Sequence, residues 1–221
     1  MSKQNRYKDR YRTGDTPWDL GMPDFNLTDM VTKRPIRHCK TLEIGCGTGD
    51  NAVWLAQQNF VVRGTDISEI AIQKAIEKAF KAGVKCTFLV IDFLNQKISG
   101  APFGFVFDRG CFHSFNSDEE RKQFAINAAF HLEKGGLWLS IVGSADDPPR
   151  DSGPPQRTAK DIVTAVEPYF EILSLNSRHF DSNRPNPPRA WVCLMRKRDN
   201  FNRSRKFRNV KLGETEWRKR F

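Results

Sequence analysis

The sequence predicts an α/β fold: a single doubly wound, Rossmann-like domain with a mostly parallel seven-stranded sheet and a C-terminal antiparallel hairpin. Short apolar runs alternate with helical patterns between residues 39 and 143, which is typical of parallel strands joined by helical crossovers. A turn with three glycines follows the first apolar run, where an open α/β sheet binds its ligand. Two apolar runs near the C-terminus are joined by a proline-rich turn, which indicates the hairpin.

Apolar runs predict five parallel strands, at 39–45, 60–66, 85–92, 103–108 and 137–143. Helical periodicity predicts the helices between them, at 50–58, 69–83 and 117–136. The third helix begins with a capping signal, Ser117 followed by Glu120, and we expect it to end at paired glycines. A loop, a short helix and the two hairpin strands follow, at 144–158, 158–169, 170–180 and 189–197.

The basic charge of the chain is concentrated at its two ends. The 221 residues carry a formal net charge of +10, a balance that points to nucleic acid or another acidic surface as a partner. Residues 1–12 carry +4 and residues 196–221 carry +8, so residues 13–195 carry −2. The expected folded part is therefore close to neutral, and nucleic acid binding through the basic tail is not the favoured interpretation.

No segment predicts a membrane protein, a secreted protein or a metal site. No apolar run approaches the roughly 20 residues of a membrane span, and the polar N-terminus lacks the apolar stretch of a signal peptide. The five cysteines are scattered, without a CxxC pair or zinc-ligand spacing: Cys39, Cys46, Cys86, Cys111 and Cys193. We therefore expect reduced thiols in a cytoplasmic protein that binds no metal.

The strongest chemical signal is LEIGCGTGDNAVWLA at 42–56, in which an apolar run enters a glycine turn and then a helix. Glycines let the backbone pass close to a ligand, and Asp66, at the end of the next strand, can accept both hydroxyls of a ribose. The spacing is G-x-G-x-G rather than the G-x-G-x-x-G of dinucleotide sites, and Asp50 would face a pyrophosphate. A cationic nucleoside such as S-adenosylmethionine fits better, with Glu43 near its positive end; an NAD-dependent reductase is the alternative.

With this motif the chain resembles the class I S-adenosylmethionine-dependent methyltransferases over residues 13–196. Three segments resemble the thiopurine, thiol and tellurite-resistance methyltransferases in particular: GDTPWDLGMPD at 14–24, GTDISEIAIQKA at 64–75 and FDRGCFHSF at 107–115. The resemblance implies an N-terminal lid segment with a basic start, a methyltransferase domain and a basic C-terminal tail, at 1–38, 39–196 and 197–221.

The resemblance also implies roles for individual residues, with S-adenosyl-L-methionine as the cofactor. Besides Glu43, the residues expected to hold it are Trp18, Gly45, Cys46, Gly47, Asp66, Ile67, Asp92 and Phe93. Asp108 and Arg109 would lie beside the methyl group, where Arg109 can orient an anionic acceptor. The nearby His113 is a candidate general base.

We expect a small-molecule acceptor, most of all a thiol or a related sulfur, selenium or tellurium nucleophile. The Asn/Asp-Pro-Pro-aromatic motif of nucleobase amino methyltransferases is missing after the fourth strand, and so is a Pro-Cys nucleophile. Two alternatives remain: an RNA or protein methyltransferase that holds its substrate with the basic tail, and a nucleic-acid-binding module without catalysis. The protein is expected to be a monomer or a dimer, with solvated arginines in its C-terminal loops at Arg150, Arg157, Arg184 and Arg189.

Overall fold

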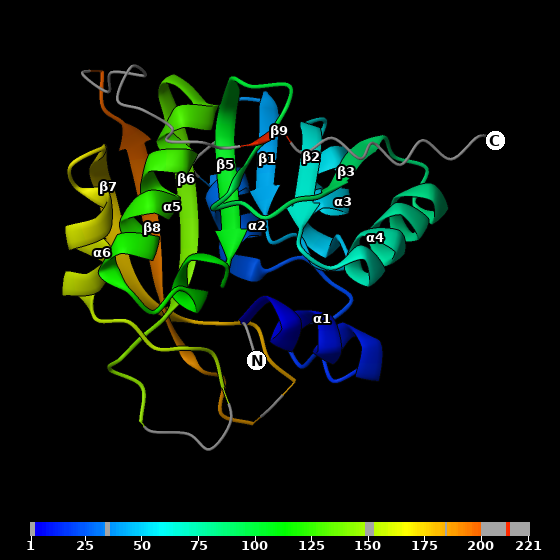
Figure 1. Ribbon diagram of the computed structural model, residues 1–221, viewed down its shortest axis with the longest axis horizontal. Helices are drawn as coiled ribbons and strands as arrows, with labels where there is room; N and C mark the ends of the chain where they lie inside the picture. Colours follow the sequence, from blue (N-terminus) through cyan, green and yellow to red (C-terminus); the bar gives the residue numbers. More distant parts are fainter. Residues whose placement is uncertain (1–2, 34–35, 149–152, 184, 200–210, 213–221) are drawn as a thin grey trace.

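A seven-stranded sheet is the centre of the computed structural model, which describes residues 3–33, 36–148, 153–183, 185–199 and 211–212. The strand order is β3-β2-β1-β5-β6-β8-β7, and β8 alone runs against the others in this sheet (Figure 1). The strands are β1 (Lys40–Ile44), β2 (Val61–Asp66), β3 (Cys86–Val90), β5 (Phe103–Arg109), β6 (Leu132–Gly143), β7 (Phe170–His179) and β8 (Arg189–Lys197). The predicted fold class is confirmed, including the C-terminal hairpin.

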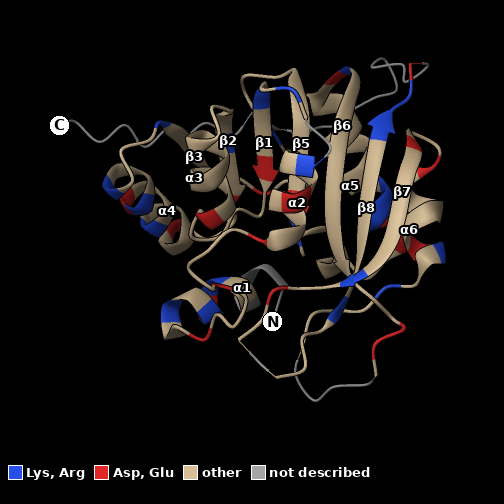
Figure 2. Ribbon diagram, turned by 180° about the vertical axis from the view of Figure 1, so that it is seen from behind, with Lys and Arg blue, Asp and Glu red and all other residues tan. Residues whose placement is uncertain are grey.

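Helices cover both faces of the sheet and the edge at which its parallel strands end. They are α1 (Lys3–Thr13), α2 (Phe25–Lys33), α3 (Asp50–Gln57), α4 (Glu69–Lys81), α5 (Asp118–His131) and α6 (Ala159–Val166), with a 3-10 helix η1 (Phe112–Ser114). Helix α1 lies below the carboxyl ends of the parallel strands (Figure 1). Figure 2 shows α2 in front of β1 and β5 on the opposite side from α5, with basic and acidic residues interspersed along α1 and α4.

The two faces of the sheet bury different side chains because strands alternate with a period of two. Along β5, Phe105 and Phe107 pack on the side of α2, α3 and α4, whereas Val106 packs on the side of α5 and α6. Trp138 of β6 is fully buried on the second side, with its ring 5.6 Å from that of Phe124. The central strands are therefore apolar on both faces, as expected for a parallel sheet that is covered twice.

The third predicted helix ends earlier than expected. Its capping box is present, but the helix stops at His131 instead of continuing to Gly136. Leu132 is already extended, with φ −78° and ψ 146°, and it pairs with Phe103 of β5. The paired glycines lie inside β6, beside a shift in its register with β5. They therefore belong to an irregular part of the strand and do not end the helix.

The chain on either side of the predicted methyltransferase domain adds structure that the sequence did not indicate. Before β1 it forms α1 and α2, and α2 buries Leu27 and Val31 against the sheet. In the predicted basic tail, β9 (Lys211–Leu212) pairs in parallel with β4 (Gln96–Lys97). Residues 200–210 and 213–221 of that tail lie outside the described residues.

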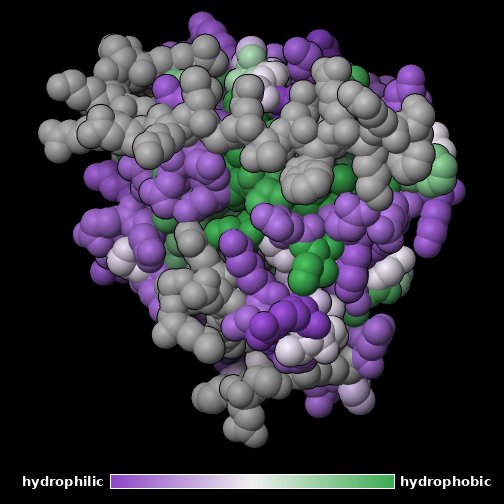
Figure 3. All heavy atoms as spheres, turned by 45° about the vertical axis from the view of Figure 1, so that its right-hand side comes forward, coloured by the Kyte–Doolittle hydropathy of each residue, from purple (hydrophilic) through white to green (hydrophobic). Residues whose placement is uncertain are grey.

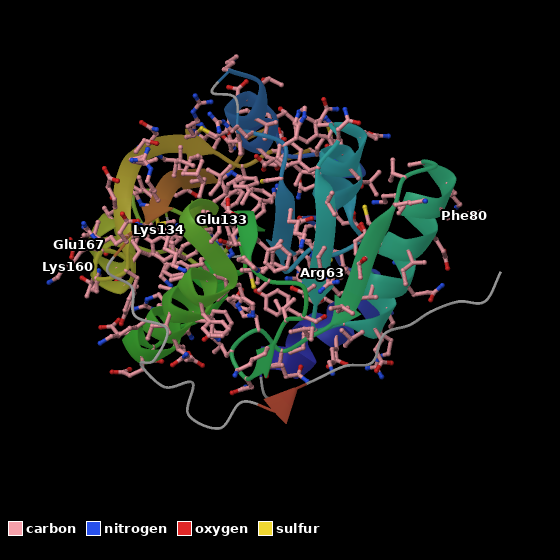
Figure 4. The ribbon with its side chains drawn as sticks, turned by 90° about the horizontal axis from the view of Figure 1, so that it is seen from above. Arg63, Phe80, Glu133, Lys134, Lys160 and Glu167 are labelled. Atoms are coloured by element: carbon pink, nitrogen blue, oxygen red, sulfur yellow. The ribbon has the colours of Figure 1, made fainter. Side chains whose placement is uncertain are left out.

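The side of the molecule that carries α4 and β3 exposes hydrophobic side chains between hydrophilic ones (Figure 3). Phe80 projects from the outer face of α4 and is 79% exposed (Figure 4), and Val61 at the start of β2 is 67% exposed. A shallow groove of about 510 Å³ runs between α4 and the end of β3, with Ile70, Ile76 and Val90 among its lining residues. Within the described ranges, no helix is long and apolar enough to cross a membrane.

The contact between the glycine turn and α4 can be tested by unfolding. Gly49 has φ +87°, and a Cβ there would lie 2.9 Å from Ala75 Cβ. We expect Gly49→Ala to lower the free energy of unfolding by about 2–4 kcal/mol, because left-handed strain and overpacking add. Gly83→Ala is the matched control, since Gly83 has φ +67° with nothing within 4 Å of its Cβ and only the strain of about 1–2 kcal/mol applies. Urea unfolding measures both, and equal losses would refute the steric constraint.

Candidate functional site

The glycine turn between β1 and α3 passes between two other segments at very short range. Gly45 and Gly47 both have positive φ, +70° and +55°. A Cβ on Gly45 would lie 3.0 Å from Cys111 Cβ, and one on Gly47 would lie 2.8 Å from the Tyr11 hydroxyl. The turn therefore needs glycine at both positions, because its conformation is left-handed and because a side chain would collide with Cys111 or Tyr11. We call the backbone of residues 45–47 the glycine cradle.

Asp66 lies beside this turn because β1 and β2 are parallel neighbours. Its Oδ2 accepts a hydrogen bond from the Gly47 N–H (3.0 Å), and its Oδ1 accepts one from the Ser68 N–H (2.9 Å). Burial raises the pKa of the Asp66 carboxyl, and these backbone N–H groups lower it. The structure thus brings together the glycines and the carboxylate that the sequence singled out.

Three aromatic side chains of the N-terminal segment pack over the turn. The Trp18 indole donates to the Tyr11 hydroxyl (3.0 Å), and the Tyr7 and Tyr11 rings meet Trp18 edge-on, with centroids 5.6 and 5.9 Å away. The Arg10 guanidinium lies over the Trp18 ring at 4.7 Å. The predicted contact of Trp18 with the cofactor stays a prediction. The sequence did not single out the two tyrosines, although their spacing of four residues on a helix was the available signal.

Carboxylates surround the start of α3. Asp50, the first residue of that helix, accepts from the Lys78 ammonium and from the Gly21 N–H (3.1 Å), and Asp19 accepts from the Thr48 hydroxyl (2.7 Å). A helix N-terminus attracts phosphate through its free N–H groups and its dipole, but here it faces two carboxylates against the single Lys78 ammonium. The arrangement disfavours a pyrophosphate and suits a ligand with positive charge.

Glu43 lies in β1 beneath the same turn and is 1% exposed. Its Oε1 accepts from the Asn51 side-chain amide (3.1 Å). Burial raises the pKa of Glu43 to about 8, the Asn51 hydrogen bond opposes this shift, and the nearby Asp50 and Asp66 charges add to it. A cation bound at the turn would favour the ionised form of this carboxyl.

Cys46 and Ile67 border the turn in different ways. Cys46 is 5% exposed, and its side chain belongs to the core behind the turn, so its backbone is the part that faces the glycine cradle. Ile67 is half-buried between Asp66 and the start of α4.

All five cysteines are free thiols, and among the described residues no group of three His, Cys, Asp or Glu is arranged to hold a metal ion.

Asp92 and Phe93 follow β3 and are occupied within the protein. The Asp92 carboxylate accepts from the Leu94 N–H (3.1 Å) and from the Asn95 side-chain amide (2.7 Å), which closes the loop after the strand. The Phe93 ring packs in the core, with its centroid 4.7 Å from that of Phe124. Contact of these two residues with an adenine therefore stays a prediction.

Asp108 is fully buried at the end of β5. One oxygen accepts from the Phe112 N–H (2.9 Å) and the Cys111 N–H (3.2 Å), and the other accepts from the Trp138 indole (2.9 Å). Burial raises the pKa of Asp108 to about 6, against the effect of these hydrogen bonds. This placement gives Asp108 the position of a residue that holds the turn into η1, rather than of one that touches a reactant.

His113 lies under Gly110, and a Cβ on that glycine would be 3.0 Å from its Nε2. Its Nδ1 accepts a hydrogen bond from the Gly143 N–H (2.9 Å). Burial lowers the pKa of His113 to about 3, and the positive charges of Arg157 and Arg109 lower it further. A neutral ring with Nδ1 engaged carries its proton on Nε2, so the geometry argues for a hydrogen-bond donor and against a general base.

The arginines of the site are also engaged. Arg109 donates to three residues in two separate segments, and its ion pair is with Asp24 of the N-terminal segment. Arg157, expected to be solvated, is half-buried and donates to the Phe115 carbonyl (2.9 Å) and to Asn116 Oδ1 (2.8 Å). Arg189 donates to a loop carbonyl, whereas Arg150 and Arg184 lie outside the described residues.

Comparison with known proteins agrees with this geometry. Residues 41–136 match the family model described as a methyltransferase domain. An uncharacterized methyltransferase of Schizosaccharomyces pombe is 42% identical over 97 residues, which are 43% of this chain and 67% of that protein. The chain belongs to the class I S-adenosylmethionine-dependent methyltransferases.

Two further relatives cover more of this methyltransferase. A probable thiol methyltransferase of Arabidopsis thaliana is 28% identical over 165 residues, which are 74% of this chain and 69% of that protein. A 2-heptyl-1-hydroxyquinolin-4(1H)-one methyltransferase of Mycobacteroides abscessus is 26% identical over 171 residues, 76% of this chain and 74% of its own.

Among solved structures, one from work on the conversion of a disulfide bond into a thioacetal group during echinomycin biosynthesis has a TM-score of 0.79. It is 23% identical and covers 89% of this chain and 92% of its own. The predicted cofactor is supported, and the alternatives of an NAD-dependent reductase and of a module without catalysis fall away. The glycine cradle and its carboxylates fit the positively charged S-adenosylmethionine.

The buried carboxyl of Glu43 predicts a pH dependence of stability in the absence of cofactor. Because its pKa is raised from 4.5 to about 8, Glu43 contributes stability below its unfolded pKa, and this contribution is lost as the pH rises through about 8. We expect Glu43→Gln to reduce the fall in unfolding free energy between about pH 5 and pH 8, by on the order of 1 kcal/mol or more. Urea unfolding over that range is the measurement. The exposed Glu77→Gln is the control, and identical slopes for both variants would contradict the assignment.

Proposed function

We propose that this methyltransferase transfers the methyl group of S-adenosylmethionine to a small thiol or a related sulfur, selenium or tellurium nucleophile. The observation that carries the proposal is the likeness to a probable thiol methyltransferase over 165 residues, 74% of this chain. The sequence resemblance at residues 14–24, 64–75 and 107–115 supports the same acceptor class. A small hydroxylated aromatic is the second candidate, because a hydroxyquinolone methyltransferase is also similar.

The proposed cofactor site is the glycine cradle with its carboxylates and its aromatic cover. Gly45, Cys46 and Gly47 would contact the cofactor through their backbone, and Asp66 would accept the ribose hydroxyls. Further proposed contacts are those of Trp18, Glu43, Ile67, Asp92 and Phe93. When bound, S-adenosylmethionine supplies a methyl group on a positively charged sulfur.

On the acceptor side, the proposed work of the chain is to align the nucleophile and exclude water. Alignment contributes about 7–11 kcal/mol to such a displacement, and no proton has to be given to the leaving group. Asp108 would hold the turn that carries Gly110, and His113 would donate a hydrogen bond through Nε2 rather than take a proton. A thiol needs little help from a base, since its pKa lies near neutrality, at about 8.5.

Binding of S-adenosylmethionine should depend on Asp66. We expect Asp66→Ala to weaken binding by about 10- to 100-fold, since it removes a charged acceptor for the ribose hydroxyls. Asp66→Asn keeps one acceptor oxygen and should lie between Asp66→Ala and the wild type. Isothermal titration gives the dissociation constants, with Asp29→Ala on the outside of α2 as the control. Unchanged affinity in Asp66→Ala would reject this cofactor site.

The acceptor class should be visible in a methyl-transfer assay over thiols, phenols, N-hydroxyquinolones, amines and carboxylates. We expect the highest kcat/KM for thiols, and a rate that rises with pH as the thiolate forms. Removing residues 200–221, which keeps β8 and the buried Lys197, should leave that rate within about twofold, because the small acceptor needs no basic tail. Activity confined to phenols or amines would reject the thiol assignment, and salt-sensitive activity on RNA or protein that is lost with the tail would favour the macromolecular alternative.

A further inference from the structure

The Arg109 guanidinium bonds to two segments that are distant from it and from each other in the sequence, the N-terminal segment and the β7–β8 connection. Its Nε donates to Asp24 Oδ2 at 2.6 Å, its Nη1 to the Trp18 carbonyl at 3.3 Å, and its Nη2 to the Asp181 carbonyl at 3.1 Å. The same guanidinium lies 5.2 Å above the Phe180 ring. Arg109 sits at the end of β5, so these bonds tie the N-terminal segment and the β7–β8 connection to the rigid sheet.

Asp24 is the partner that makes this junction specific. Its side chain is fully buried, and the Arg109 side chain is 13% exposed. The second carboxylate oxygen of Asp24 accepts from the Asn26 N–H and side-chain amide (both 2.9 Å). The backbone N–H of Asp24 donates to Asn51 Oδ1 (2.9 Å). Asn51 in turn donates to Glu43 under the glycine turn. A continuous set of buried hydrogen bonds therefore runs from Glu43 to Arg109.

A direct role in acceptor binding suits this geometry poorly. All three guanidinium nitrogens of Arg109 already donate to protein oxygens, and its charge is paired in a buried site. Releasing it toward an acceptor would leave the buried Asp24 carboxylate without its cation, which is costly.

We propose that Arg109 is a positioning residue that holds the Trp18 segment over the glycine turn and, through Asp24, couples this cover to the cofactor site. Arg109 acts through Trp18, whose indole bonds to the Tyr11 hydroxyl over Gly47. The same side chain bonds to the Asp181 carbonyl at the start of the β7–β8 connection. One residue therefore fixes both the Trp18 segment and this connection. The inference depends on cofactor binding at the glycine turn and not on which acceptor is used.

The test is a double-mutant cycle on the full chain with Arg109→Lys and Asp24→Asn, using S-adenosylhomocysteine as the probe. Lysine keeps the charge but lacks the planar fork that lets Arg109 donate to Asp24, Trp18 and Asp181 at once. We expect each single variant to weaken S-adenosylhomocysteine binding by about 10-fold, and the double variant by about 10-fold as well rather than 100-fold, because both changes break one junction. Isothermal titration gives these constants, and thermal unfolding shows that each variant is folded.

Amide hydrogen exchange separates a positioning role from a general loss of stability, because only the positioning role predicts faster exchange confined to particular segments. Arg109→Lys should raise amide exchange in residues 14–24 and 180–183, while the central strands keep theirs. Arg178→Gln is the matched control, because Arg178 joins β7 to α2 through an exposed ion pair with Asp29 (3.1 Å) and should leave affinity within about twofold. Unchanged affinity for S-adenosylhomocysteine in both single variants, with a raised KM for the methyl acceptor, would overturn the proposal in favour of acceptor binding. Additive losses in the double variant would overturn it as well.

Discussion

The close packing around the glycine turn is the constraint on which the rest of the site depends. Each glycine of the turn meets a different part of the molecule: Gly45 the loop after β5, Gly47 helix α1, and Gly49 helix α4. A side chain at any of the three would push one of these parts away. The turn therefore sets the distance between the sheet edge and the N-terminal segment, and with it the space in which a nucleoside can lie.

The electrostatics of the site follow from the same packing. Glu43 and Asp66 are carboxyl groups placed next to backbone that excludes water, and burial raises the pKa of each. A positive charge at the turn favours the ionised forms of both groups, so the binding of a sulfonium cofactor and the ionisation of Glu43 are coupled. The near-neutral charge of residues 13–195 means that this attraction is local and does not arise from the net charge of the domain.

The sequence predicted the parts of the structure that local patterns determine. The apolar runs and the glycine spacing were enough to predict the strands, their crossover helices and the neighbourhood of Asp66. The end of α5 was wrong because it is decided by the pairing of Leu132 with Phe103, a contact 29 residues away along the chain that helix signals do not contain. Tyr11 and Asp24 were missed for a similar reason, since their partners Gly47 and Arg109 are distant in the sequence.

The candidate catalytic residues show how chemistry and burial have to be considered together. Asp108 has both oxygens bonded, His113 accepts a backbone N–H and is neutral, and Arg109 is paired with Asp24. The Nδ1 lone pair of His113 is therefore engaged, Arg109 has no lone pair to offer, and the Asp108 carboxylate is buried and bonded within the protein. That arrangement suits a thiol, whose pKa of about 8.5 lets a fraction of it ionise near neutral pH without a protein base, so that its methylation requires alignment and the exclusion of water. It suits an alcohol or an unactivated amine poorly, since their protons would need an acceptor at the moment of transfer.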